Sequence, residues 1–419
     1  MTELSGLAAI RRTLGHRDFG IYVAGNGISL IGTWVQRIAI GWLTWELTES
    51  GAWLGAVAFA DLFPAVLIGP IGGVFADRFP RIKVIRAAQM LLMLQALTLF
   101  ALTASDIINI WGVLTLALFN GVVIGFNQPA RLALVPSLVP RADLATAVAI
   151  NAIMFNLARF IGPAIAGALI VVWGTAPAFG INAISYFAFL FALTRLRATD
   201  DLDRRGARAE GGSMFGDLAE GLRYATRHPG IGVLLLLMVI LSLGVRPVIE
   251  LMPGFAADVF DRGAEALAML SATLGLGAIG GGFWLAQRGS QTGLATIVMV
   301  AMAVASVATF GFVAGTNLAL ALPCVAIFGF SLVSAGVSTQ TLLQIAVDGT
   351  MRGRVLSLYG LIFRGGPALG ALVMGAASEF VGLRWPLAVG AAVVLAALVW
   401  SWGRRHTVAA ALETPGAVT

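Results

Sequence analysis

Apolar residues are gathered in long blocks along this chain, with short polar segments between them. Twelve blocks are long enough to cross the hydrocarbon layer of a bilayer, which is roughly 30 Å thick and needs about 20 helical residues. The blocks lie at about 19–44, 52–75, 84–104, 110–130, 145–172, 177–195, 230–252, 266–287, 293–314, 317–345, 355–380 and 384–402. The pattern predicts an all-α membrane protein with twelve transmembrane helices.

The longest polar segment, residues 197–229, separates the first six blocks from the last six. Its second part, Ser213–Arg227, has apolar and charged residues at helical spacing, which is typical of an amphipathic helix on a membrane surface. A plain tether is favoured over a regulatory contact. We therefore predict four parts: an N-terminal six-helix bundle (1–196), a cytoplasmic linker with an amphipathic helix (197–229), a C-terminal six-helix bundle (230–403) and a cytoplasmic tail (404–419).

The two halves carry traces of an internal repeat. An offset of 209 residues places Arg37 on Arg246, and an offset of 205 places Arg159 on Arg364. Transporter folds often contain such repeats. We therefore expect two pseudo-symmetric bundles.

Composition and charge support a membrane protein and give its orientation. Hydrophobic residues make up 58% of the chain and charged residues only 11%, whereas about a quarter of the residues in soluble proteins are charged. If the N-terminus is cytoplasmic, 21 of the 27 Lys and Arg residues fall on the cytoplasmic side and only Arg262 and Arg384 fall on the outer side, while the remaining four lie within predicted spans. This predicts a bacterial inner-membrane protein with both termini in the cytoplasm, and the net charge of +6 reflects topology rather than nucleic-acid binding.

A short charged turn follows the second apolar block. It contains Gly73, Asp77, Arg78, Arg81 and Lys83. This order resembles motif A, the signature of the cytoplasmic loop between helices 2 and 3 in the major facilitator superfamily, although Pro80 stands where the motif has glycine. The resemblance implies a twelve-helix transporter, in which this cluster gates the cytoplasmic face.

Three further segments resemble one branch of that superfamily. Two of them, Asn127–Arg131 and Pro136–Pro140, look like the corresponding segments of siderophore exporters of the enterobactin-exporter kind and of macrolide efflux pumps. The third, Ala158–Gly167, includes Gly162 and Pro163 and is similar to motif C of exporters. The resemblance implies export. Many proton-coupled exporters carry an arginine four residues before the position of Gly121, but this chain has Ala117 there, so coupling needs other groups.

We single out a set of charged residues inside the predicted spans: Arg37, Asp61, Arg159, Arg246, Glu250 and Arg364. A charge at mid-bilayer costs about 2.5–3.5 kcal/mol on insertion scales, so such residues normally face a bundle interior or a water-filled cavity. Four positive charges against two negative ones favour an anionic substrate.

The roles of these charges differ by position. Asp61 is the most deeply placed acid and the candidate for proton coupling; the alternative is a permanent salt bridge to an arginine such as Arg37. In this family the helices of Arg37 and Arg246 line the central cavity, so with Trp34 they are candidates for substrate contact. The spacing of four predicts that Glu250 shares a helix face with Arg246, where the two form a structural ion pair or bind substrate.

Arg159 and Arg364 each precede a proline, Pro163 and Pro367, where backbone bends are expected. In this family their helices lie along the contact between the halves. We therefore expect ion pairing at a gate or interface rather than ligand binding.

No cofactor, metal site or enzyme activity is predicted. The glycine run Gly275–Gly280 has dinucleotide-motif spacing but lies within an apolar block, so close helix packing through Gly277 and Gly281 is the better interpretation. The histidines have no metal-ligand spacing. The chain also has no P-loop, so the energy for any transport must come from an ion gradient or from the substrate itself.

The sequence thus favours a secondary transporter that exports a siderophore-like or amphiphilic drug-like organic solute in exchange for protons, by alternating access around a midplane cavity. Import of a similar solute is the alternative mechanism, and a non-transporting membrane sensor or scaffold is the alternative class. The expected partners are a small organic substrate of anionic character, protons and the lipid bilayer. A monomer without nucleic acid is expected.

Overall fold

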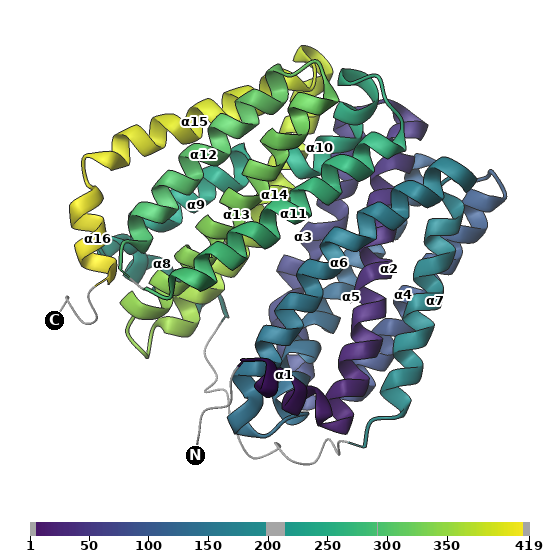
Figure 1. Cartoon of the computed structure of the whole chain (residues 1–419), viewed down its shortest axis with the longest axis horizontal. Helices are drawn as coiled ribbons and strands as arrows, with labels where there is room; N and C mark the ends of the chain where they lie inside the picture. The colour runs from purple at the N-terminus through teal and green to yellow at the C-terminus, as the bar shows by residue number, and fades with distance from the viewer. Residues whose placement is uncertain (1–5, 198–213, 291, 414–419) are drawn as a thin grey trace. The chain divides into compact units, whose positions relative to one another are not determined.

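A computed structural model describes residues 6–197, 214–290 and 292–413 of the 419-residue chain, and these ranges are nearly all helical, without a strand (Figure 1). The prediction of an all-α membrane protein is confirmed. The helices of the first half are α1 (Gly6–Gly15), α2 (Arg17–Thr48), α3 (Gly51–Arg78), α4 (Arg81–Ala104), α5 (Ile110–Leu134), the short η1 (Val135–Ser137) and η2 (Arg141–Asp143), α6 (Leu144–Trp173) and α7 (Ala176–Thr194).

The second half begins with α8 (Met214–Arg227). It continues with α9 (Ile231–Gly244), α10 (Val248–Gly254), the π-helical η3 (Phe255–Val259), α11 (Ala264–Arg288), α12 (Leu294–Ala314), α13 (Leu318–Ala346), α14 (Arg352–Val381), α15 (Arg384–Trp402) and α16 (Arg405–Glu413). The linker residues 198–213 and the tail residues 414–419 lie outside the described residues.

Eleven helical segments in the described ranges are long and apolar enough to cross a membrane, and all of them coincide with predicted blocks. One of the eleven, Ile231–Val259, is built from α9, α10 and η3. α2 coincides with the first predicted block and has 32 residues, but buried polar side chains such as Asn26 and Gln36 lower its hydropathy. By helix length and hydropathy, eleven of the twelve predicted spans are therefore confirmed, and α2 is the one that does not meet these criteria.

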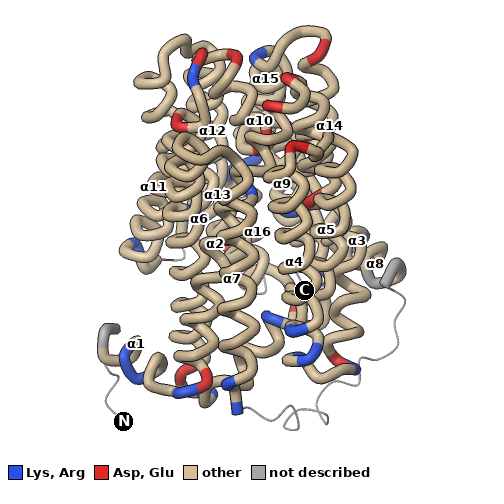
Figure 2. Tube along the Cα trace, turned by 90° about the vertical axis from the view of Figure 1, so that its right-hand side faces the viewer, with Lys and Arg blue, Asp and Glu red and all other residues tan. Residues whose placement is uncertain are grey.

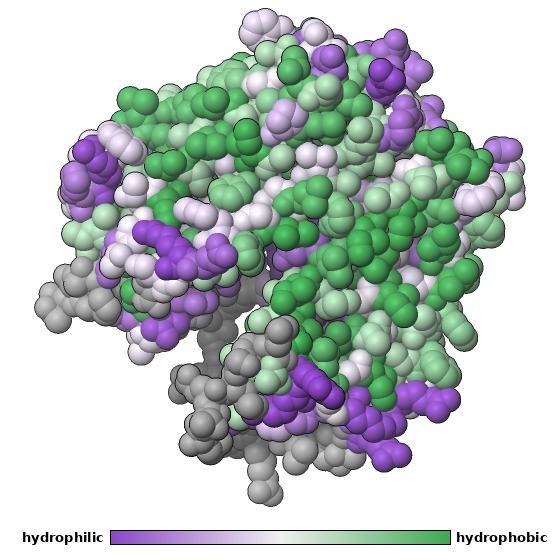
Figure 3. Space-filling model, viewed as in Figure 1, coloured by the Kyte–Doolittle hydropathy of each residue, from purple (hydrophilic) through white to green (hydrophobic). Residues whose placement is uncertain are grey.

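The outer flanks of the helices are apolar. Large apolar side chains such as Trp173, Phe380 and Val399 are exposed by 67%, 90% and 77%. Figure 3 shows apolar side chains covering the helix flanks, with hydrophilic ones gathered towards helix ends. In the bundle that carries α1, Lys and Arg residues concentrate at the end where α1 lies (Figure 2). Such surfaces are suited to lipid, since a soluble monomer rarely exposes large apolar patches.

The chain forms two compact units. Unit 1 comprises Met1–Leu47 and Ala60–Ala209, and unit 2 comprises Thr48–Phe59 and Glu210–Thr419. α3 therefore contributes its first turns to unit 2 and the remainder to unit 1. The boundaries expected from the sequence, at 196/197, 229/230 and 403/404, stay predictions.

Within unit 2, the start of α3 packs closely on α14. A Cβ atom at Gly55 would collide with the carbonyl oxygen of Ala371. The Glu379 carboxylate accepts hydrogen bonds from Ser50 Oγ at 2.7 Å and from the backbone N–H of Ala52 at 3.0 Å. Because the first N–H groups of a helix have no intrahelical partner, this carboxylate caps α3.

The helix that carries Arg246 is interrupted, which corrects the prediction that Arg246 and Glu250 share one continuous helix face. α9 ends at Gly244 and α10 begins at Val248. Pro247, which lies in the break, lacks an N–H group and its ring would clash with the preceding turn of a regular helix. The hydropathy pattern does not register such a break, because the segments on both sides, α9 and α10, are mainly apolar.

The glycine run in α11 serves helix packing, as predicted. A Cβ atom at Gly277 or Gly281 would collide with the carbonyl oxygens of Ala326 and Phe330 on α13. From the facing helix, a Cβ at Gly329 would collide with the carbonyl oxygen of Leu274. Small residues let backbones approach in this way because lipid provides no hydrophobic drive for association.

We expect Gly277→Val to reduce the melting temperature of the detergent-purified protein and its level in the membrane, because α11 and α13 must separate to admit the side chain. Gly280→Ala is the matched control, since a Cβ there has only an ordinary contact with Phe330, at 3.7 Å. Equal melting temperatures for Gly277→Val and the unaltered protein would contradict the packing role.

Candidate functional site

In unit 1, the Trp34 side chain of α2 lies between two arginines. The guanidinium carbon of Arg37 is 5.4 Å from the centroid of the Trp34 ring, and that of Arg159 on α6 is 5.6 Å away. Phe155 of α6 meets the same ring edge-on at 5.9 Å. Cations within about 6 Å of an aromatic face are attracted by its quadrupole. The structure thus brings Arg159, which was expected at a gate or interface, together with Trp34 and Arg37, the candidates for substrate contact.

Gly162 determines how closely α6 approaches this ring. A Cβ atom at Gly162 would collide with the Cβ of Trp34 and would lie 3.3 Å from the carbonyl oxygen of Ile31. Gly162 and Pro163 are both buried. The motif C-like segment therefore positions Arg159 against α2.

A related arrangement occurs in unit 2. The guanidinium carbon of Arg246 lies 4.0 Å from the centroid of the Phe363 ring on α14, and its Nη1 donates to the carbonyl oxygen of Phe363 at 2.7 Å. The Tyr359 ring packs against Phe363 at a tilt, with ring centroids 5.6 Å apart, and its hydroxyl donates to the carbonyl oxygen of Gly336 at 3.0 Å. Arg364 is exposed and does not join this aromatic contact.

Glycines also allow the close approach of α14 to α9. A Cβ atom at Gly366 would lie 2.5 Å from the Cβ of Ser242, and one at Gly370 would lie 2.5 Å from the carbonyl oxygen of Leu243. Pro367, between these glycines, is buried. In both units, then, an arginine from the first transmembrane stretch packs on an aromatic ring near a glycine-mediated helix contact.

Asp61 lies where α3 meets α5. Asn120 Nδ2 donates to Asp61 Oδ1 at 2.6 Å. A Cβ atom at Gly121 would lie 2.5 Å from the Asp61 carbonyl oxygen and 2.8 Å from that of Ala60, so only glycine permits this approach. Asn120 was not identified from the sequence, although its position beside Gly121 could have indicated it. The proposed coupling role of Asp61 stays a prediction.

A buried network of neutral polar side chains crosses unit 1. Gln36 of α2 donates to Gln95 Oε1 of α4 at 3.0 Å and accepts from Asn182 Nδ2 of α7 at 2.8 Å. Ser185 Oγ donates to Asn182 Oδ1 at 2.9 Å, and Gln95 Nε2 donates to the carbonyl oxygen of Leu116 at 3.3 Å. Charge-based reasoning overlooked this network because none of its members is ionisable.

Basic side chains near the motif A turn bind the ends of neighbouring helices. Arg81 Nη1 donates to the carbonyl oxygen of Ala133 in the last turn of α5, at 3.1 Å. Arg86 Nη2 donates to the carbonyl oxygen of Leu193 in the last turn of α7, at 2.6 Å. Cations stabilise helix C-termini, where carbonyl groups lack intrahelical partners. Arg81 thus has a structural contact, and Arg86 was missed because it lies one turn beyond the motif.

Of the two glycines before the turn, only one lies against a neighbouring helix. A Cβ atom at Gly72 would collide with the carbonyl oxygen of Gly125 on α5, whereas one at Gly73 would meet nothing within 4 Å. Asp77, Arg78 and Lys83 are exposed. Their gating role stays a prediction.

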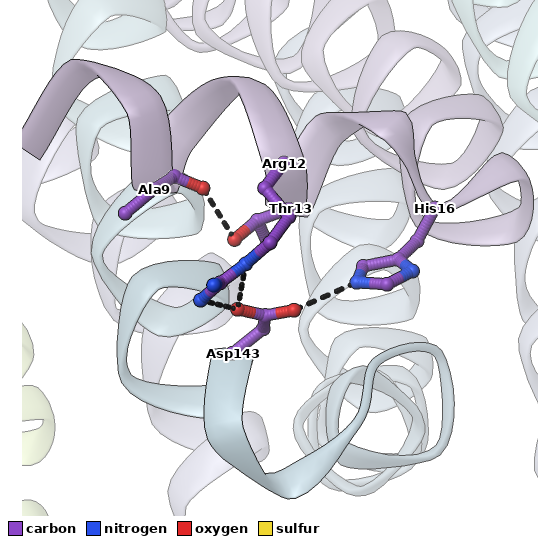
Figure 4. A network of polar contacts seen from close by, with 5 residues as sticks. All are labelled: Ala9, Arg12, Thr13, His16 and Asp143. Atoms are coloured by element: carbon purple, nitrogen blue, oxygen red, sulfur yellow. Dashed lines mark hydrogen bonds and ion pairs between the residues drawn. The ribbon is translucent and has the colours of Figure 1, made fainter. Parts of the chain in front are cut away.

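At the same end of unit 1, Asp143 joins α1 to the start of α6 (Figure 4). Arg12 Nε donates to Asp143 Oδ1 at 2.9 Å, and Asp143 Oδ2 forms a hydrogen bond with His16 Nε2 at 2.8 Å. Asp143 is only 3% exposed, whereas Arg12 is exposed. This contact could not be predicted from a local pattern, because its partners are more than a hundred residues apart in the chain.

Arg131 lies in the interior of unit 1. Its guanidinium carbon is 4.8 Å from the centroid of the Phe189 ring, which itself packs edge-on against Tyr22 at 5.8 Å. Its Nε and Nη2 atoms are buried, without a hydrogen-bond partner among the described residues. The sequence had included Arg131 only as part of a segment that resembles exporters.

A family model described as transmembrane secretion effector matches residues 7–413. The Staphyloferrin A transporter of Staphylococcus aureus (strain NCTC 8325 / PS 47) is 24% identical, over 86% of this chain and 90% of that protein. Macrolide efflux protein A of Streptococcus pyogenes is 23% identical over 90% of this chain and 93% of that protein. Enterobactin exporter EntS of Shigella boydii serotype 4 (strain Sb227) is 25% identical over 90% of this chain and 88% of that protein.

Solved structures show the same fold. A bacterial homologue of the human lysosomal transporter Spinster has a TM-score of 0.74 at 14% identity, over 95% of this chain and 99% of that chain. A bacterial homologue of the iron transporter ferroportin has a TM-score of 0.67 at 16% identity, over 95% of this chain and 99% of that chain. The predicted resemblance to enterobactin exporters and macrolide efflux proteins is confirmed, and the chain belongs to the transmembrane secretion effector family of the major facilitator superfamily of transporters.

Proposed function

We propose that this chain is a secondary active transporter that exports an organic solute across the bacterial inner membrane in exchange for protons, by alternating access. The observation that carries the proposal is the pair of arginine–aromatic clusters, Arg37 with Trp34 and Arg159 in unit 1, and Arg246 with Phe363 in unit 2. Guanidinium groups beside aromatic faces suit a solute that carries anionic groups and rings. A siderophore-like or amphiphilic drug-like compound has this chemistry.

The names of the relatives support export as the direction, since two of them are called efflux protein and exporter. Exchange for protons would supply sufficient energy, because a membrane potential of 100 mV contributes about 2.3 kcal/mol per charge moved. Asp61, which accepts a hydrogen bond from Asn120, is the candidate proton carrier.

Everted membrane vesicles test direction and coupling together. A panel of siderophores, macrolides and lysolipids is offered to everted vesicles with an acidic lumen. We expect the chain to accumulate at least one class inside, and a protonophore to abolish this accumulation. Accumulation only in right-side-out vesicles would establish an importer, and transport of no compound in either orientation would favour a sensor or scaffold.

The proposed orientation places α8 in the cytoplasm. With the single native cysteine removed by Cys324→Ala, we expect Thr226→Cys on exposed α8 to resist an impermeant maleimide in intact spheroplasts and to react after permeabilisation. Ser105→Cys, between α4 and α5, is the control that should react in intact spheroplasts. Labelling of Thr226→Cys from outside would overturn the topology.

A further inference from the structure

A cavity of about 640 Å³ lies beside α8 in unit 2, at the turn between α13 and α14. Its volume falls within the range of about 300–1,000 Å³ that is typical of small-molecule pockets. The lining residues that matter for its chemistry are Glu220, Arg223, Tyr224, Arg227, His228 and Asp348. Neither the transport proposal nor the family motifs involve this cavity.

The two acids of the cavity already have partners. Arg354 Nη1 lies 3.2 Å from Glu220 Oε2. Tyr224 donates from its hydroxyl to Asp348 Oδ2 at 3.0 Å. The negative charge of Glu220 is therefore balanced by a cation, and the Asp348 carboxylate is hydrogen-bonded to a neutral hydroxyl.

The two arginines of the cavity are differently placed. Arg223 and Arg227 are one turn apart on α8, both are exposed, and within the described part of the chain neither forms a hydrogen bond or ion pair. Like charges at a spacing of four residues repel each other and destabilise a helix. An anion that contacts both guanidinium groups would remove this repulsion.

His228 adds a neutral donor. Its Nδ1 accepts hydrogen bonds from the backbone N–H groups of Gly230 and Ile231, each at 3.2 Å, so the ring proton resides on Nε2. The side chain is only 8% exposed, and burial lowers the pKa of His228 while the nearby Asp348 charge partly opposes this. The ring can thus donate from Nε2 without being charged.

We propose that this cavity binds the phosphate group of an anionic phospholipid headgroup. Two guanidinium groups and a neutral N–H are the donors that phosphate oxygens prefer, and guanidinium groups bind phosphate with paired, charge-assisted hydrogen bonds. A lipid rather than a soluble phosphate is favoured because α8 ends only three residues before the membrane span that begins at Ile231. In addition, Leu222, next to Arg223, is 54% exposed and provides an apolar surface for an acyl chain.

Such a lipid would link α8 to the α13–α14 turn, because Met351 and Asp348 of that turn border the same cavity. The contact would add to the Arg354–Glu220 ion pair, which already spans these elements. Phospholipid composition would then influence the stability of unit 2.

The test uses the full chain purified in neutral detergent. Phosphatidylglycerol is titrated into the micelles, with phosphatidylcholine as the neutral lipid, and the melting temperature is followed. We expect phosphatidylglycerol to raise the melting temperature with saturation, and Arg223→Gln/Arg227→Gln to weaken its apparent affinity about tenfold or more, since each charge-assisted contact is lost. Arg11→Gln/Arg141→Gln, which alters two other exposed arginines, is the matched control and should keep the affinity.

Inorganic phosphate and glycerol 3-phosphate form the soluble arms of the same test. If either produces the full shift at millimolar concentration, the lipid assignment is wrong. Equal affinity of phosphatidylglycerol for the altered and unaltered chains would overturn the site itself. If the double variant does not fold, cross-linking of the unaltered chain with a headgroup-labelled photoreactive phosphatidylglycerol decides: label in α8 or residues 345–354 supports the site, and label only elsewhere overturns it.

Discussion

Asp61→Asn is expected to abolish transport driven by a pH gradient while leaving substrate binding intact. The amide resembles the protonated carboxyl in size and charge but cannot release a proton. It also keeps an oxygen that can accept the hydrogen bond from Asn120, which is 2.6 Å long in the unaltered chain. The contact between α3 and α5 at Gly121 should therefore persist. Proteoliposomes with an imposed pH gradient provide the transport assay, and a binding measurement on the same protein provides the second readout.

Glu250→Gln is the matched control, because Glu250 is the other acid identified within the spans. It belongs to the first turn of the short α10, and we expect its loss to change affinity more than coupling. If Asp61→Asn retains full transport under a pH gradient, Asp61 is not the coupling site, and Glu250 becomes the leading acid.

Trp34→Leu is expected to raise KM for export about tenfold or more. The level of protein in the membrane should change by a much smaller factor. The substitution removes the ring that contacts both Arg37 and Arg159. Each cation–π contact contributes about 0.5–2 kcal/mol, and tenfold in affinity corresponds to about 1.4 kcal/mol. The two guanidinium groups would also lose the surface that fixes their orientation.

Phe155→Leu serves as the comparison, since Phe155 touches the Trp34 ring but is exposed and is not the ring that either arginine contacts. Its effect on KM should be clearly smaller. An unchanged KM in Trp34→Leu, or an equal change in Phe155→Leu, would argue against the cluster as a substrate contact.

The helices were predictable because an apolar block of about 20 residues is a strong signal that does not depend on neighbouring elements. The break at Pro247 was not predicted, because hydropathy averages over a window in which most residues are apolar. Proline alone does not locate a break either: Pro163 and Pro367 lie within the uninterrupted helices α6 and α14. Which prolines interrupt a helix depends on the packing around them.

Individual charged residues of the candidate site could be predicted from the sequence, but the contacts between them could not. Arg37, Asp61 and Arg159 stood out because charges are rare in apolar blocks. Their contacts with Trp34 and Asn120 depend on which helix faces join, and no spacing within one helix contains that information. Neutral polar groups such as Gln36 and Asn182 give a weaker signal, because an isolated amide in an apolar block is not rare enough to indicate a network.

Because α3 belongs partly to unit 2 and partly to unit 1, its bending has a mechanical consequence. Its first turns are held in unit 2 by Gly55 and by the Glu379 cap, and its remainder is held in unit 1 by Gly72 and by the contact at Gly121. A helix resists bending, so we expect α3 to bend most easily near Pro64, where one backbone hydrogen bond is missing. Asp61 lies one turn from that proline. Bending of α3 at that proline would therefore move the Asp61 carboxyl group and change its hydration at the same time.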